Sequence, residues 1–146
     1  IVKETQLIPG VDGQKMSKSY GNIIEIFGAE KKIRKKIMSI ITDSTPVEDP
    51  KDPNQSIIID LFNLVGSTED VEVMKSDFLK GGIGYGDFKK RLFEAFWDYF
   101  QPMRQKRDEL SEDLNYVDNV LQTGAEKARE AAKLTLKRAR KACGIE

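Results

Sequence analysis

The chain of 146 residues has no histidine, one cysteine and no long apolar run. Without histidine, Ser-His-Asp and Cys-His nucleophiles, histidine acid-base catalysis and most zinc sites are excluded, and we expect no protein metal site. Cys143 cannot pair within the chain, so it fits a reducing compartment and is expected to act as a small apolar residue. The chain lacks both the ~20 apolar residues of a membrane span and the pattern of a signal peptide. We therefore expect a soluble, cytoplasmic protein without membrane contact.

Net charge is also lacking, because 24 Lys and Arg balance 24 Asp and Glu. The total charge therefore favours no partner, and RNA binding would need a locally basic surface.

Apolar residues recur at helical spacing along most of the chain, whereas a strand is suggested only for residues 1–7. The longest pattern contains Phe88, Leu92, Phe96, Phe100 and Met103, and Pro102 predicts a kink within it. The predicted fold is mainly α, with helices at 29–41, from a cap at Asn54 to 64, at 68–80, from 87 to about 110, at 115–121 and, after a break at Gly124, at 125–142.

The segment from Pro9 to Asn22 carries the chemistry that the sequence suggests. Glycines give it conformational freedom, and Lys15 and Lys18 are each followed within two residues by a serine. Lysine ammonium groups supply charge without a fixed angular fork, so they can follow the oxygens of a polyphosphate as charge shifts. The alternative is an ordinary surface loop with solvated lysines.

The full string Gly-x-Asp-Gly-x-Lys-Met-Ser-Lys-Ser resembles the second signature of class I aminoacyl-tRNA synthetases, called KMSKS. Three further segments resemble the tryptophanyl enzymes, namely Thr42-Asp43-Ser44, the stretch 84–90 and the stretch 124–129. The resemblance implies activation of tryptophan by ATP with Mg²⁺ and transfer to tRNA(Trp). It also implies that Lys15 and Lys18 are catalytic, and that the ATP-binding residues are Lys15, Met16, Ser17, Lys18 and Ser19.

The same resemblance implies how the chain is organised. Residues 1–28 would be a remnant of a Rossmann-like catalytic domain, a strand plus the KMSKS loop, and residues 29–146 a C-terminal helical bundle that binds the tRNA anticodon. The family's first signature contains histidine, so this chain cannot carry it. We expect a C-terminal portion that is inactive alone and monomeric, from an enzyme that is a homodimer.

Two basic stretches are candidates for tRNA contacts under this interpretation. Lys89, Lys90 and Arg91 follow the glycine-rich junction 81–86, which we interpret as a helix cap and tight connection rather than a phosphate loop. Lys133, Lys137 and Arg140 lie opposite the alanine face of the last helix. A solvated helix surface is the alternative for both sets. The alternatives for the whole chain are a tyrosyl-tRNA synthetase fragment and a free-standing helical module that binds RNA or protein.

Overall fold

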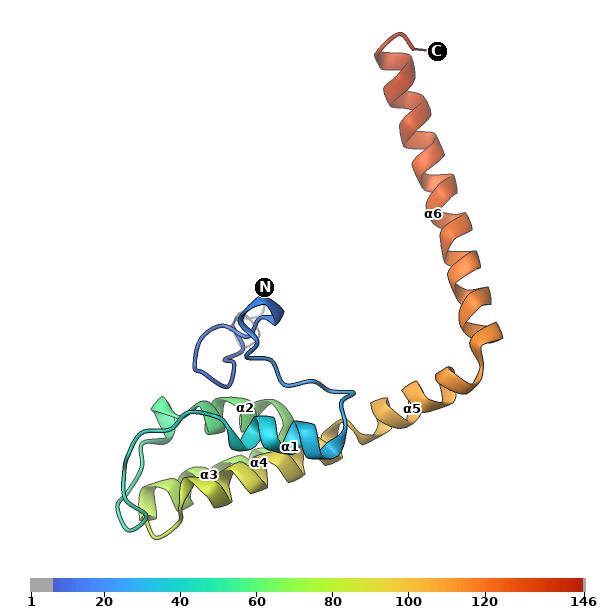
Figure 1. Cartoon of the computed structure of the whole chain (residues 1–146). Helices are drawn as coiled ribbons and strands as arrows, with labels where there is room; N and C mark the ends of the chain where they lie inside the picture. Colours follow the sequence, from blue (N-terminus) through green and yellow to red (C-terminus); the bar gives the residue numbers. More distant parts are fainter. Residues whose placement is uncertain (1–6, 146) are drawn as a thin grey trace. The chain divides into compact units, whose positions relative to one another are not determined.

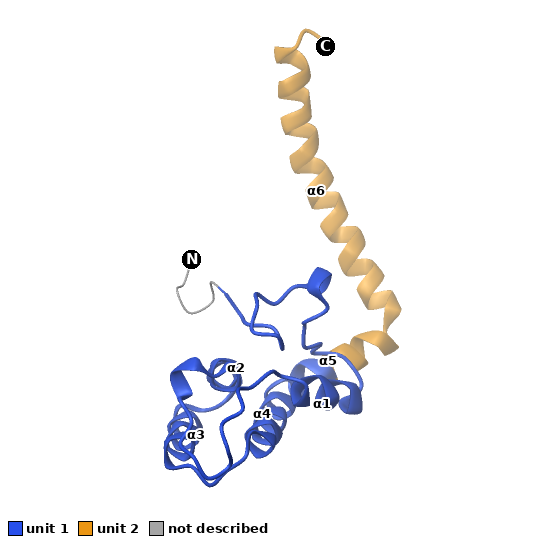
Figure 2. Cartoon of the chain, turned by 60° about the vertical axis from the view of Figure 1, so that its left-hand side comes forward, with its two compact units in different colours: residues 1–104 blue, residues 105–146 orange. Residues whose placement is uncertain are grey.

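The computed structural model describes residues 7–145, which fall into two compact units that divide between Arg104 and Gln105 (Figures 1 and 2). Apart from Leu7, the strand expected at residues 1–7 lies outside the described residues. Within residues 7–145 the β pairing consists of one isolated bridge between Pro9 and Lys15, and the rest is helix and loop. The mainly α fold is confirmed, whereas the domain boundary at 28/29 stays a prediction.

The helices of the first unit begin with a short one within the long N-terminal loop and continue after it. They are η2 (Lys18–Tyr20), α1 (Glu30–Met38), η3 (Pro53–Gln55), α2 (Ile57–Val65), α3 (Thr68–Lys80), α4 (Tyr85–Tyr99) and the first turn of α5 (Gln101–Glu112).

Helix α4 is the spine of this unit, because it packs against both α1 and α2, while α3 packs against α2 (Figure 1). The pattern that predicted a broad apolar face is confirmed for Phe88, Leu92 and Phe96, which are buried. The ring centroids of Phe78 and Phe88 lie 4.0 Å apart at the centre of one continuous core. Burying each such side chain contributes roughly 1.5–3 kcal/mol, so this core stabilises the helices that carry the N-terminal loop.

Helix ends account for two departures from the sequence-based predictions. Helix α2 begins after Ser56, so the predicted cap at Asn54 is wrong; Asn54 instead lies in η3, and its N–H donates to Asp52 at 2.9 Å. Instead of a kink at Pro102, the structure has a break at Phe100, where α4 ends and after which α5 begins. Pro102 then lies in the first turn of α5, where a backbone N–H has no partner within the helix and its absence costs nothing. Met103, predicted on the buried face, lies beyond this interruption and is 45% exposed.

The second unit contains the remainder of α5 and α6 (Leu114–Ala142). The Asp113 side chain caps α6 by accepting the N–H of Tyr116 at 3.0 Å. The break predicted at Gly124 is wrong, because α6 passes through this residue without interruption. An interior glycine costs only about 1 kcal/mol relative to alanine, which a helix of 29 residues tolerates.

Candidate functional site

Backbone hydrogen bonds on both sides of Lys15 close the first part of the loop from Pro9 to Asn22. The N–H of Gly10 donates to the carbonyl of Gln14 at 2.7 Å, and the N–H of Met16 donates to that of Ile8 at 2.8 Å. Gly13, at φ +76°, makes the turn between them in a conformation that favours glycine. These two bonds hold residues 8–10 beside residues 14–16.

Asn22 lies at the centre of this loop and is only 2% exposed. Its Oδ1 accepts the N–H of Ser17 at 2.8 Å, and its Nδ2 donates to Oδ1 of Asp12 at 2.8 Å and to the carbonyl of Lys15 at 3.1 Å. The bond from Asn22 is the largest cause that lowers the pKa of Asp12. One buried amide therefore connects three positions of the loop.

The five predicted ATP-binding residues, 15–19, lie between Asp12 and Asn22 in the chain, and both lysines among them are exposed. Ser17 precedes η2, and its Oγ lies 2.8 Å from Oγ of Ser19. Lys18 begins η2, which Gly21 ends at φ +65°. Two exposed cations and two hydroxyl groups therefore lie within five consecutive residues, the kind of donors that an anionic ligand binds.

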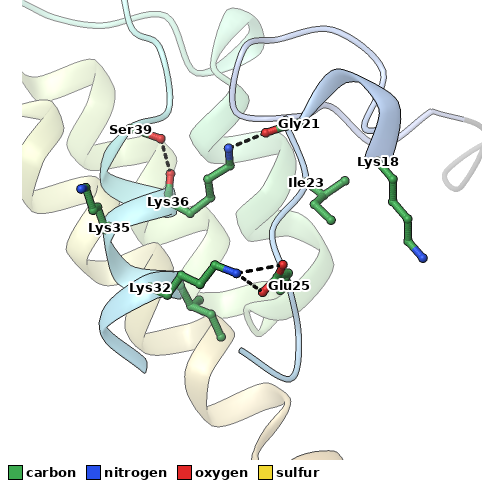
Figure 3. A pocket seen from close by; sticks show the side chains of 9 residues that line it. Lys18, Gly21, Ile23, Glu25, Lys32, Lys35, Lys36 and Ser39 are labelled. Atoms are coloured by element: carbon green, nitrogen blue, oxygen red, sulfur yellow. Dashed lines mark hydrogen bonds and ion pairs between the residues drawn. The ribbon is translucent and has the colours of Figure 1, made fainter. Parts of the chain in front are cut away.

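Two lysines of helix α1 contact the chain at and just after the η2 turn (Figure 3). Nζ of Lys36 donates to the carbonyl of Gly21 at 2.6 Å, and Nζ of Lys32 pairs with the Glu25 carboxylate at 3.0 Å. Both side chains cross a hollow of about 490 Å³ between α1 and the segment that follows the loop, whereas Lys18 points away from α1. The loop is therefore tied to the first helix of the helical body.

Two further segments that suggested the resemblance meet in space. The Tyr85 hydroxyl, at the start of α4, donates to Oδ1 of Asp43 at 2.9 Å. Hydrogen bonds from Thr45, and then from Tyr85, lower the pKa of Asp43, whereas burial and the Asp43 carboxylate raise the pKa of Tyr85. This pair fixes the connection after α1 to the spine of the unit.

The structure places the first set of predicted tRNA contacts, on α4, among intramolecular partners. Lys89 donates to the carbonyl of Met38 at 3.3 Å, and burial lowers its pKa. Nζ of Lys90 lies 2.8 Å from Asp87, and Nη1 of Arg91 lies 2.7 Å from Asp77. Each of these cations therefore has a partner within this unit, and their contact with tRNA stays a prediction.

The second set lies on α6, where Lys133, Lys137 and Arg140 are exposed. They occupy successive turns of one helix, so the structure groups them as the sequence predicted. The two sets belong to different compact units.

Comparison with known proteins identifies the family. The family described as "tRNA synthetases class I (W and Y)" matches residues 2–101, which include the whole lysine loop. The chain belongs to this family.

Curated relatives narrow the similarity to tryptophan-tRNA ligases. That of Rhodopirellula baltica is 49% identical over 138 residues, covering 94% of this chain and 43% of the relative. That of Fusobacterium nucleatum is 42% identical over 147 residues, covering 99% and 44%. The chain is thus a homologue of tryptophan-tRNA ligases and spans less than half the length of these curated relatives.

Solved structures agree with this assignment. A crystal structure of tryptophanyl-tRNA synthetase from Campylobacter jejuni superposes with a TM-score of 0.87 at 40% identity, covering 95% of this chain and 45% of that one. Another, described as complexed with ADP and tryptophan, has a TM-score of 0.87 at 39% identity and covers 97% and 44%.

Among residues 7–145 there is no group of three or more His, Cys, Asp or Glu side chains that could hold a metal ion. No helix in the same range is long and apolar enough to span a membrane.

The sequence-based prediction of the site missed two residues that hold the loop, Asn22 and Lys36. An asparagine after a glycine is a weak signal, and two of the three partners of Asn22 are backbone groups that no residue type reveals.

Proposed function

We propose that this chain supplies the KMSKS loop and helical body of a tryptophan-tRNA ligase, the enzyme that forms tryptophanyl-adenylate from tryptophan and ATP and transfers the amino acid to tRNA(Trp). The observation that carries this proposal is the exposed pair Lys15 and Lys18 on a hydrogen-bonded turn, in a chain whose relatives are tryptophan-tRNA ligases. The C. jejuni homologue with ADP and tryptophan supports a nucleotide and tryptophan as ligands.

In the proposed reaction a carboxylate oxygen of tryptophan attacks the α-phosphorus of ATP. A new P–O bond forms while the bond to the β-phosphate breaks, so negative charge accumulates on the leaving pyrophosphate. Lys15 and Lys18 would bind those oxygens, with Ser17 and Ser19 as hydroxyl donors, and Mg²⁺ would arrive bound to ATP. Catalysis is then positioning and electrostatic stabilisation, which explains why a chain without histidine can contribute to it.

The rest of the chain is proposed to serve tRNA. Residues 1–28 would belong to a Rossmann-like catalytic domain and residues 29–146 to a helical domain that binds the tRNA anticodon, within a cytoplasmic homodimeric enzyme. Both basic sets, Lys89, Lys90 and Arg91 on α4 and Lys133, Lys137 and Arg140 on α6, are proposed to contact the tRNA backbone. The chain alone is proposed to be inactive, because the amino acid pocket is not among its recognised motifs.

The test measures tryptophan-dependent exchange of pyrophosphate into ATP by the full gene product that contains this chain. Lys18→Ala should lower kcat by about 100-fold or more, the size expected when a preorganised stabiliser of transition-state charge is lost. Lys75→Ala is the matched control, because this lysine pairs with Glu72 on the surface of α3, remote from the loop in sequence.

Two outcomes would contradict the proposal. Full exchange activity in Lys18→Ala would remove the loop from catalysis. Exchange that depends on tyrosine rather than tryptophan would make the protein a tyrosyl enzyme, which the matching family also includes.

A further inference from the structure

We propose that Asn22 is the positioning residue of the lysine loop, whose single buried carboxamide sets where Lys15 and Lys18 present their ammonium groups. This inference rests on the proposed function and deepens it, because it names the residue through which the catalytic lysines are placed. Asn22 acts on the backbone on both sides of Met16, through the carbonyl of Lys15 and the N–H of Ser17.

Both polar atoms of the Asn22 amide have hydrogen-bond partners. An asparagine side chain has two N–H donors and one carbonyl acceptor. Both donors are used, by Asp12 and by the carbonyl of Lys15, and the acceptor binds the N–H of Ser17. The opposite amide orientation would place its oxygen against the Asp12 carboxylate and its NH₂ group against the N–H of Ser17, so the partners permit one orientation only.

The space around the amide is equally restricted. A Cβ atom added at Gly10 would lie 2.3 Å from Nδ2 of Asn22, so the backbone of Gly10 packs directly against the side chain. The N–H of Val11 donates to the carbonyl of Asn22 at 3.1 Å, and Oδ1 of Asp12 also accepts the N–H of Gln14 at 3.1 Å. The position of the amide is therefore restricted by the backbone of Gly10 and by an Asp12 carboxylate that is itself held by Gln14.

This arrangement bears directly on the two catalytic lysines. The carbonyl that Asn22 holds belongs to Lys15, and the N–H that it holds belongs to Ser17, which leads into the turn begun by Lys18. Stabilisation of developing charge depends on donors that are already in place, and a displacement of about 1 Å can cost about 100-fold in rate. Losing the amide would release the carbonyl of one lysine and the turn that carries the other.

The first test uses Asn22→Ala in the full gene product. We expect kcat for tryptophan-dependent pyrophosphate exchange to fall by about 30- to 100-fold, while KM for ATP changes by less than about threefold, because the lysines act on the transition state more than on bound ATP. Met74→Ala is the matched control: it truncates a buried core side chain on α3 and should lower thermal stability, yet leave kcat within about threefold where the protein is folded.

The second test separates positioning from general support of the fold. In a background that carries Lys15→Ala and Lys18→Ala, Asn22→Ala should lower the remaining rate by less than about twofold, because residues that act as a unit are not additive. A structural effect would instead lower the rate by the same factor in both backgrounds.

The third test exchanges the two side chains that face each other. Asn22→Asp alone brings a carboxylate against Asp12 and the Lys15 carbonyl, so it should be at least as harmful as Asn22→Ala. Adding Asp12→Asn restores a donor opposite the new carboxylate and should recover part of kcat. Absence of any recovery, with both proteins folded, counts against the pair as the element that orients the loop.

Failure of this inference and failure of the proposed function can be told apart. Where the wild type exchanges pyrophosphate and Lys18→Ala does not, normal kcat in Asn22→Ala overturns the positioning residue alone. Where the wild type shows no exchange, the proposed function falls and the inference falls with it. Hydrogen exchange in the chain checks the geometry separately: the Ser17 amide should lose protection in Asn22→Ala, and unchanged protection would show that Asn22 does not hold it.

Discussion

The buried ammonium group of Lys51 allows the sharpest prediction about stability. Lys51 is 2% exposed, and its Nζ donates to the carbonyls of Pro46 at 2.9 Å, Val47 at 3.2 Å and Asp49 at 2.9 Å. The group also lies 5.5 Å from the centroid of the Tyr85 ring. This one cation therefore binds three carbonyls of the loop after α1 and also contacts Tyr85 at the start of α4.

The magnitude follows from opposing contributions. A hydrogen bond that involves a charged group contributes about 1.5–3 kcal/mol, so three of them give roughly 4–9 kcal/mol. Removing the charge regains several kcal/mol of desolvation, and the carbonyls of this exposed loop can bind water instead. Lys51→Met, which keeps the aliphatic stem, should therefore lower the free energy of unfolding by about 2–4 kcal/mol.

The assay is urea unfolding of the chain followed by circular dichroism, with Lys75→Met as the matched control. Lys75 pairs with Glu72 on the surface, and such pairs contribute about 0–1 kcal/mol. Lys51→Arg should recover little, because a planar guanidinium fits three convergent carbonyls poorly. Equal losses of below about 0.5 kcal/mol in Lys51→Met and Lys75→Met would refute the reasoning, since the three bonds would then contribute nothing in solution.

Further predictions concern glycines and one carboxylate. Gly10→Ala should displace the buried amide that packs on it and abolish most exchange activity, whereas Gly86→Ala, where an added Cβ meets nothing within 4 Å, should be neutral or stabilising in the same assay and in thermal melts. Gly124→Ala should raise the helix content of α6 and stabilise it by about 1 kcal/mol by circular dichroism, and a loss of helix would contradict the continuous α6. The hydrogen bond from Arg91 lowers the pKa of Asp77, so its stabilisation is present above the unfolded pKa of about 3.8 and is lost as pH falls through the lower folded value. Asp77→Asn should flatten this acid dependence in pH-dependent urea midpoints, and an unchanged profile would show that the pair is not formed.

The helices could be predicted where apolar residues recur at helical spacing, as on α4. The same spacing places those side chains on one face of the helix, which is the face that packs into the core. Their ends were less predictable. Asn54 and Ser56 can both cap a helix, and tertiary packing of the isoleucines on α2 decides between them. Gly124 has the local preference of a helix breaker, but its penalty is small against the length of α6.

The candidate site shows a different limit. The residue types from Lys15 to Ser19 allow phosphate binding to be predicted, because the prediction depends on side-chain charge and hydroxyl groups that the sequence gives directly. Asn22 escapes such an inference, since its function lies in hydrogen bonds to backbone groups that any residues would provide. The same holds for Lys36, whose acceptor is the carbonyl of Gly21. Side chains that act on a ligand can thus be found from residue type and spacing, whereas side chains that place them become visible only when the backbone conformation is known. The positioning of the lysines by Asn22 is therefore the part of this site where structure, rather than sequence, supplies the testable claim.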